Sequence, residues 1–229
     1  MLKSKIPEIK ISKENFNEDL LGKIYLDNKN KSIFVAELLK NGEKHVYDLD
    51  SMPYDICSKN DQIIISHSNC LKIYDKDLNF IKKVDRINGE EFYLSAILAN
   101  FDVKQFYICD NLNDRILITD LDFNFIKLVG STGSENCQFD NPCDICFSNS
   151  KFYICDNDNK RIQVYSKDFD FVTSLKVEYY PWKIKSTNST ICVVADDQDG
   201  IYFYNSNDFH LIRNYNDLEG RISQINSMF

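Results

Sequence analysis

The chain has 229 residues, of which 43% are hydrophobic and 27% are charged, with a net charge of −8 and a pI near 4.9. This hydrophobic content excludes an intrinsically disordered chain, and the acidic balance disfavours nucleic acid as a partner, because phosphate binding relies on Lys and Arg. No apolar run is long enough for a signal peptide or a membrane span. We therefore expect a cytoplasmic protein with no membrane association that folds as a single domain over residues 1–229.

The first predicted elements are short apolar strands that precede residue 50. One strand is predicted over residues 5–12. Residues 21–50 then hold three more, over residues 24–26, 33–36 and 45–47, with polar turns between them. We interpret residues 21–50 as a degenerate copy of the repeat that follows.

A clear repeat begins after residue 50. The segment 106–119 (FYICDNLNDRILIT) returns as residues 152–165 (FYICDNDNKRIQVY), and weaker copies occupy residues 63–74 and 192–204. Self-similarity at a fixed period is the signature of repeat architectures, in which every copy is one supersecondary unit. We therefore read the chain as a series of equivalent units.

Each copy of the repeat has a further apolar strand on either side. The strand before it starts at Pro53, Leu94, Pro142 or Pro181, and proline is tolerated as the first residue of a strand. A polar turn and a last apolar strand follow. Four strands in roughly 40 to 46 residues have the size of a propeller blade. The predicted blades cover residues 51–86, 87–130, 131–177 and 178–217.

A single four-stranded blade cannot bury both of its faces, so repeated blades stack side by side around an axis. The sequence therefore predicts an all-β fold, a β-propeller of about five to six four-stranded antiparallel blades. A predicted strand at residues 220–227 would share a last blade with residues 5–12. The alternative is that the propeller is incomplete in this chain.

The turn between the third and fourth strands has the same register in every blade. Its third residue is Asn79, Asn124, Asp170 or His210. Asn, Asp and His are the non-glycine residues that best tolerate a positive φ. Because the chain has only seven glycines, we predict that these residues supply the left-handed conformation of the turn.

The blade at residues 131–177 carries a recognisable motif. The string NPCDI at residues 141–145, followed by residues 152–165, resembles an NHL repeat, and residues 106–119 match nearly as well. The resemblance implies a non-catalytic protein-interaction platform, a scaffold or a substrate-recognition module that works with a separate effector such as a ubiquitin ligase. An RNA-binding NHL propeller is the alternative. The first cysteine is Cys57, inside the repeats, so we expect no zinc-binding RING among the residues before them.

Two oppositely charged pairs recur at one place in the best repeats. Asp110 with Arg115, and Asp156 with Arg161, flank the turn between the second and third strands. The weaker blades lose both members together, having Ser66 with Cys70 in one and Ala195 with Gly200 in the other. A charge-assisted hydrogen bond that closes the turn explains this joint loss. We therefore predict that the pairs are structural.

No set of residues indicates catalysis, a metal or a cofactor. Cys143 and Cys146 have the spacing of half a zinc site, whereas a structural site needs four ligands, so we expect the cysteines to be reduced and to fill small buried positions. His45, His67 and His210 are scattered among different blades, and we expect each to be a surface or turn residue. A metal-dependent propeller hydrolase or lyase is a further alternative, but we predict no enzyme, no metal and no cofactor.

The turns and the loops between blades carry the candidate binding residues. Carboxylates gather there, among them Asp158 and Asp197, and their field favours a basic protein partner. The segment 178–182 adds Tyr179, Tyr180 and Trp182 as candidate aromatic anchors. The alternative is that Trp182 and one of the two tyrosines pack between blades. The sequence predicts no oligomeric state.

Overall fold

The structure, a computed structural model, describes residues 23–27, 32–36, 45–48, 53–59, 62–77, 79–187, 189–196 and 200–215. Within these ranges the regular elements are β-strands and one short 3-10 turn, with no α-helix. No helix in the described ranges is therefore long and apolar enough to cross a membrane. The strands predicted at residues 5–12 and 220–227 lie outside the described residues.

The chain divides into two compact units, residues 1–84 with 219–229 and residues 85–218. The first unit holds two antiparallel sheets. The three-stranded sheet consists of β1 (Lys23–Asp27), β2 (Ser32–Ala36) and β3 (His45–Asp48). The four-stranded sheet consists of β4 (Pro53–Lys59), β5 (Gln62–His67), β6 (Cys70–Asp75) and β7 (Phe80–Val84).

The second unit holds three four-stranded antiparallel sheets, and in each the strands pair in chain order. The first consists of β8 (Leu94–Asn100), β9 (Gln105–Asp110), β10 (Arg115–Asp120) and β11 (Phe125–Val129), with the 3-10 turn η2 (Asn111–Asn113) between β9 and β10. The second consists of β12 (Pro142–Ser148), β13 (Lys151–Asp156), β14 (Arg161–Ser166) and β15 (Phe171–Lys176). The third consists of β16 (Pro181–Ser186), β17 (Thr190–Ala195), β18 (Ile201–Asn205) and β19 (Leu211–Tyr215).

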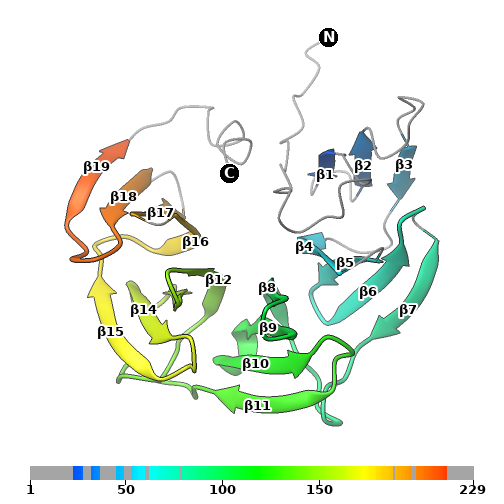
Figure 1. The fold of residues 1–229 in the computed structure, drawn as a ribbon, viewed down its shortest axis with the longest axis horizontal. Helices are drawn as coiled ribbons and strands as arrows, with labels where there is room; N and C mark the ends of the chain where they lie inside the picture. Colours follow the sequence, from blue (N-terminus) through cyan, green and yellow to red (C-terminus); the bar gives the residue numbers. More distant parts are fainter. Residues whose placement is uncertain are drawn as a thin grey trace. The chain divides into compact units, whose positions relative to one another are not determined.

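The three sheets of the second unit stack through their first strands, as Figure 1 shows for β8, β12 and β16. Strand β12 contacts β8 and β9, and β16 contacts β12 and β13. The last strands β11, β15 and β19 lie on the other side of the unit (Figure 1). This is the radial stacking that the repeat predicts.

Both faces of the middle sheet are buried, each by a different neighbour. Phe152 and Ile154 belong to the core shared with the preceding sheet, whereas Tyr153 and Cys155 belong to the core shared with β16 to β18. All four side chains are fully buried. Because residues of a strand alternate between its two faces, the continuous apolar run FYIC serves two cores at once.

The first strands of the blades share one local geometry. They begin at Pro53, Leu94, Pro142 and Pro181, as the sequence predicts. In each, the pairing register shifts between the first and third residues, so the second residue is bulged. The missing N–H of proline therefore falls beside an irregular pair, where it breaks the regular ladder least.

The expected left-handed residues of the last turn are wrong by one position. The residues with positive φ are Phe123 (70°), Phe169 (66°) and Phe209 (60°), not Asn124, Asp170 or His210. In the first of these turns the Asp120 carboxylate accepts hydrogen bonds from the backbone N–H of Asp122 and Asn124. Phe123 is only 8% exposed and stacks on Phe106. Burial of the ring thus offsets the backbone strain of a left-handed phenylalanine.

The register of the second blade also differs by one residue from the sequence alignment. Pro53 pairs with His67, as Pro142 pairs with Asp156. His67, rather than Ser66, therefore stands where the next two blades have Asp110 and Asp156, and its side chain is fully buried. The expectation that His67 is a surface or turn residue is wrong. Strand β5 continues through His67, one residue beyond the end that the alignment with the other repeats predicts.

Candidate functional site

Asp156 is a buried carboxylate at the end of β13 that accepts hydrogen bonds from four groups. The donors are the Asp140 backbone N–H (2.8 Å), Asn159 Nδ2 (3.1 Å), Arg161 Nε (2.6 Å) and Gln163 Nε2 (3.0 Å). Burial raises the pKa of the Asp156 carboxyl, while the hydrogen bonds from Asp140 and Arg161 oppose that rise. The carboxylate therefore joins the turn 156–161 to the loop that precedes β12.

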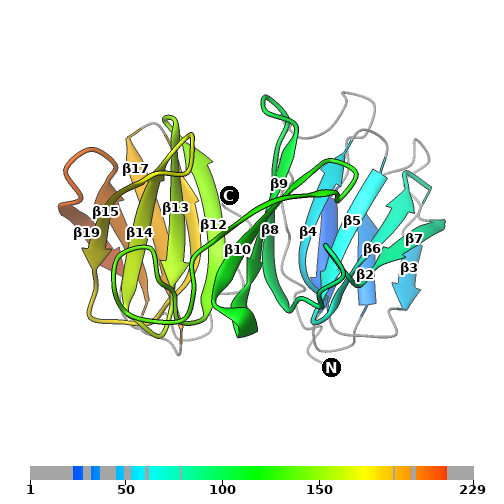
Figure 2. The same cartoon turned by 90° about the horizontal axis from the view of Figure 1, so that it is seen from below.

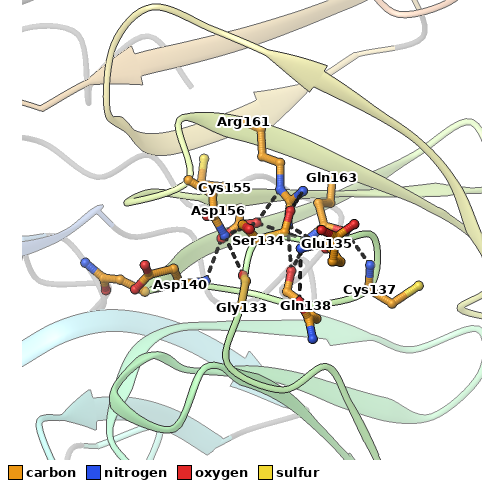
Figure 3. Close-up of polar contacts among 12 residues, drawn as sticks. Gly133, Ser134, Glu135, Cys137, Gln138, Asp140, Cys155, Asp156, Arg161 and Gln163 are labelled. Atoms are coloured by element: carbon orange, nitrogen blue, oxygen red, sulfur yellow. Dashed lines mark hydrogen bonds and ion pairs between the residues drawn. The ribbon is translucent and has the colours of Figure 1, made fainter.

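The Arg161 guanidinium holds that loop, residues 130–141, from the opposite side. Figure 3 shows it between Asp156 and the loop backbone. It donates to the carbonyl oxygens of Ser134 (2.7 Å), Glu135 (2.9 Å) and Gln138 (2.8 Å). Since the Arg161 side chain is only 6% exposed, its donors are all committed to the fold.

The equivalent pair in the preceding blade is built in the same way but is more open. Arg115 Nε donates to the buried Asp110 carboxylate at 2.7 Å, and Asp110 also accepts from the Tyr93 backbone N–H at 2.7 Å. The outer nitrogen of Arg115 pairs with Glu90, a solvent-exposed residue, at 2.9 Å. The structure thus brings together both predicted pairs, and both close turns rather than face an open site.

These turns and loops lie at one end of the strands of the second unit (Figure 2). Backbone N–H groups join them: Asn157 donates to the Asn141 carbonyl, Asp158 to that of Asp140 and Asp196 to that of Tyr180. We call the described residues 85–93, 110–114, 130–141, 156–160, 177–180 and 195–196 the turn face. Within each blade these bonds hold the turn after the second strand to the loop before the first strand, and the Asn141 N–H donates to Asp114 of the preceding blade.

Three carboxylates meet on the turn face where two blades join. Asp114 accepts a hydrogen bond from the Asn141 N–H at 2.8 Å, and Asp158 is bonded through its backbone to Asp140. The pKa of the Asp140 carboxyl is raised, first by desolvation and then by the charges of Asp158 and Asp114. The predicted residue Asp158 therefore belongs to an acidic group, whereas Asp197 lies outside the described residues.

Tyr179 lies in the core, so it offers no surface to a partner. Its side chain is 4% exposed, its hydroxyl lies 2.8 Å from that of Tyr204, and its ring stacks on Tyr202 with 3.8 Å between centroids. Desolvation and the Tyr204 hydroxyl raise the pKa of the Tyr179 phenol. This is the packing alternative that the sequence left open for one of the two tyrosines.

Tyr180 has the opposite orientation and lies on the turn face. It is 42% exposed, and the Lys160 ammonium lies 4.3 Å above the centre of its ring. Its carbonyl accepts the hydrogen bond from Asp196 N–H at 2.8 Å. Tyr180 is therefore an accessible aromatic ring on a fixed backbone.

Trp182 belongs to a different surface. It is the bulged residue of β16, in the place that Ser95 has in β8 and Cys143 in β12. Those two side chains are buried and reach the next sheet: Ser95 Oγ donates to the Pro142 carbonyl at 3.0 Å, and Cys143 Sγ lies 3.1 Å from the Pro181 carbonyl oxygen. Trp182 is 36% exposed. By its place in the repeat, it lies on the flank of its blade rather than on the turn face.

Leu112 is a turn-face residue that sequence reasoning missed. It lies in η2 and is 67% exposed. The sequence does indicate this residue, because Leu112 is an apolar residue inside the polar turn DNLND. The next blade has Asp158 at the same position. Leu112 and Tyr180 are the exposed large apolar side chains of the described turn face.

The cysteines of the second unit pack as small apolar side chains. Cys143 and Cys146 are buried, and Cys146 Sγ lies 3.2 Å from Ser186 Oγ. Burial raises the pKa of the Cys146 thiol to about 12. In the described part of the chain, no three His, Cys, Asp or Glu side chains are grouped so that they could hold a metal ion.

Comparisons with known proteins identify a fold but no family. No protein-family model matches the chain, and no curated protein matches its sequence. Among solved structures, a chain of a nidogen/laminin complex superposes with a TM-score of 0.67 at 14% identity, over 88% of this chain and 78% of that one. BBS1N in its complex with ARL6DN gives 0.64 at 14% identity, over 87% and 62%.

The Pan2 WD40 domain of Neurospora crassa gives a TM-score of 0.57 at 11% identity, over 72% of this chain and 49% of that one. WD40 domains are β-propellers, and the described chain has the same repeated four-stranded antiparallel sheets. The predicted fold class is confirmed: the chain is a β-propeller. Identities this low show the fold alone.

Proposed function

We propose that this β-propeller is a non-catalytic platform that binds a protein partner through its turn face, and that its repeats are of the NHL type. The turn closed by Asp156 and Arg161, and repeated by Asp110 and Arg115, supports the NHL assignment. The observation that carries the function is that a hydrogen-bonded, fixed surface leaves Leu112 and Tyr180 exposed beside carboxylates.

A fixed surface favours binding because little conformational freedom is lost when a partner docks. Hydrogen bonds within the blades hold the backbone at Asp158 and Asp196, and a hydrogen bond from the Asn141 N–H to Asp114 joins two successive blades. Aromatic side chains dominate the energy of protein interfaces when they fill a partner's pocket, and Tyr180 is the accessible ring of this surface. The acidic residues of the turn face favour a basic partner by long-range attraction.

The role that fits such a surface is a cytoplasmic scaffold or substrate-recognition module. The bonding of the arginines that close the turns supports a binding role without catalysis, because Arg115 and Arg161 are both committed to buried carboxylates. Chemistry at a bound partner would then be supplied by a separate effector, such as a ubiquitin ligase.

An affinity capture with matched variants tests this function. The full chain is immobilised and exposed to a cytoplasmic extract of its source cells, as wild type, as Leu112→Ser/Tyr180→Ala, and as Ile126→Ser/Leu128→Ser. The last variant removes two apolar side chains of β11 that are 44% and 41% exposed, away from the turn face. We expect the turn-face variant to lose about 90% of the captured partner, since interface anchors cost upwards of 1.4 kcal/mol.

Circular dichroism and thermal melting first establish that both variants are folded. The β11 variant should capture the partner as the wild type does. Equal recovery by the two variants, or loss only in the β11 variant, would show that binding does not use the turn face.

A further inference from the structure

The Tyr180 ring already has a cation bound to it. Lys160 Nζ lies 4.3 Å from the ring centroid, well inside the roughly 6 Å at which cation–π attraction acts. The Lys160 backbone is fixed on both sides, because its N–H donates to the Asn157 carbonyl at 3.0 Å and its carbonyl accepts from Val177 N–H at 2.9 Å. The turn therefore presents the lysine side chain to the ring.

The arginines of this region are engaged elsewhere. Arg115 pairs with Asp110 and Glu90, Arg161 with Asp156, and Arg86 with Glu91. None of these contacts involves the acidic group on the turn face.

The acidic group itself lies within the same turns. Asp158 is two residues from Lys160 and is bonded through its backbone to Asp140. Desolvation raises the pKa of the Asp140 carboxyl most, and the charges of Asp158 and Asp114 raise it further because they repel the ionised Asp140 carboxylate. A ligand that brings positive charge relieves this repulsion.

We propose that the turn face recognises an arginine- or lysine-bearing segment of the partner protein, and that Lys160 is an internal occupant of the Tyr180 ring that the partner's cation displaces. This inference rests on the proposed function. An exposed aromatic ring on a turn face that also carries carboxylates offers a peptide cation both a π surface and opposite charge. Nucleic acid does not match, because its phosphates would meet the same carboxylates.

Displacement of an internal occupant has a measurable consequence. An external cation must compete with Lys160, so removal of the lysine should tighten binding. Lys160→Met removes the competitor and one positive charge. Lys176→Met is the matched control, because it removes the same charge from an exposed position at the end of β15. Any excess gain in Lys160→Met over this control measures the competition at the ring.

The experiment measures fluorescence anisotropy of a fluorescein-labelled octa-arginine peptide with the full chain. We expect Lys160→Met to bind the peptide about two- to five-fold more tightly than Lys176→Met, the range of an exposed cation–π contact. Tyr180→Ala should weaken binding by a similar factor, and Tyr180→Phe should retain it. In the Tyr180→Ala background, Lys160→Met should gain no more than the control, as a double-mutant cycle requires for a shared contact.

Three results would overturn the inference. They are equal affinities for Lys160→Met and Lys176→Met, an unchanged affinity for Tyr180→Ala, and tighter binding of a labelled eight-nucleotide RNA than of octa-arginine. The proposed function fails separately, in the capture experiment. Leu112→Ser/Tyr180→Ala could lose the partner in that experiment while the peptide affinities do not depend on Tyr180 or Lys160. The proposed platform function would then be supported, and the recognition of a cation by Tyr180 would be refuted.

Discussion

Replacement of Arg161 by methionine should destabilise the protein far more than the same replacement of Arg115. Arg161→Met leaves the buried Asp156 carboxylate without its charged donor, and breaking a buried ion pair costs about 3–5 kcal/mol. It also removes the donors to three backbone carbonyls in residues 134–138. Each hydrogen bond contributes about 0.5–1.5 kcal/mol. The three lost hydrogen bonds therefore account for several kcal/mol of the difference in destabilisation between Arg161→Met and Arg115→Met.

Arg115→Met is the internal control, because Arg115 has the same inner partner but no loop carbonyls. Its outer contact is with Glu90, whose side chain is 58% exposed, so water screens that ion pair. We expect Arg115→Met to be milder by at least about 1.5 kcal/mol, the net contribution of the lost loop hydrogen bonds.

Urea unfolding followed by circular dichroism measures both free energies of unfolding. Hydrogen exchange monitored by mass spectrometry should show faster exchange in residues 131–139 for Arg161→Met alone. Equal destabilisation by the two variants, or no change of exchange in that loop, would refute the assignment of Arg161 as the residue that holds it.

The same pair predicts a pH dependence with a definite sign. Burial raises the pKa of Asp156 in the folded protein, so the folded state binds this proton more tightly than the unfolded state does. Loss of Arg161 removes a group that lowers this pKa and should raise it further. The deficit of Arg161→Met relative to wild type should therefore be largest at neutral pH. It should shrink as the pH falls through the raised folded pKa towards about 4, the value for an unfolded aspartate.

Two further pairs of variants test local features of the fold. Tyr179→Phe should cost about 1–3 kcal/mol, because it leaves the buried Tyr204 hydroxyl without its partner, whereas Tyr180→Phe on the exposed ring should change the unfolding free energy by less than about 0.5 kcal/mol. Gly130→Ala should lower the melting temperature more than Gly89→Ala: both glycines have positive φ, but only at Gly130 would the new Cβ meet a neighbour, the buried Phe139 ring. Thermal melting measures all four variants, and equal effects within either pair would contradict the corresponding contact.

Several features of the site could be read from the sequence because they depend on local spacing. Asp156 and Arg161 lie on paired strands at either side of one turn, so a five-residue separation was enough to predict their contact. The prolines that begin β4, β12 and β16 were predicted for the same reason, because a proline restricts its own backbone. Errors of one residue arose where a strand or a turn could shift without altering the pattern, as at His67 and Phe123.

The sequence by itself determined that this protein is made of equivalent four-stranded blades, because the same order of apolar runs and turn residues recurs along the chain. Only the tertiary structure decided which side chains of residues 179–182 are buried and which are exposed. Tyr179, Tyr180 and Trp182 are all large aromatics, and their separation into core, turn face and flank depends on the contacts of adjacent blades. The hydrogen bonds from Arg161 to residues 134–138 could not be predicted from the sequence either. They join segments more than 20 residues apart, and their acceptors are backbone carbonyls, which every residue has.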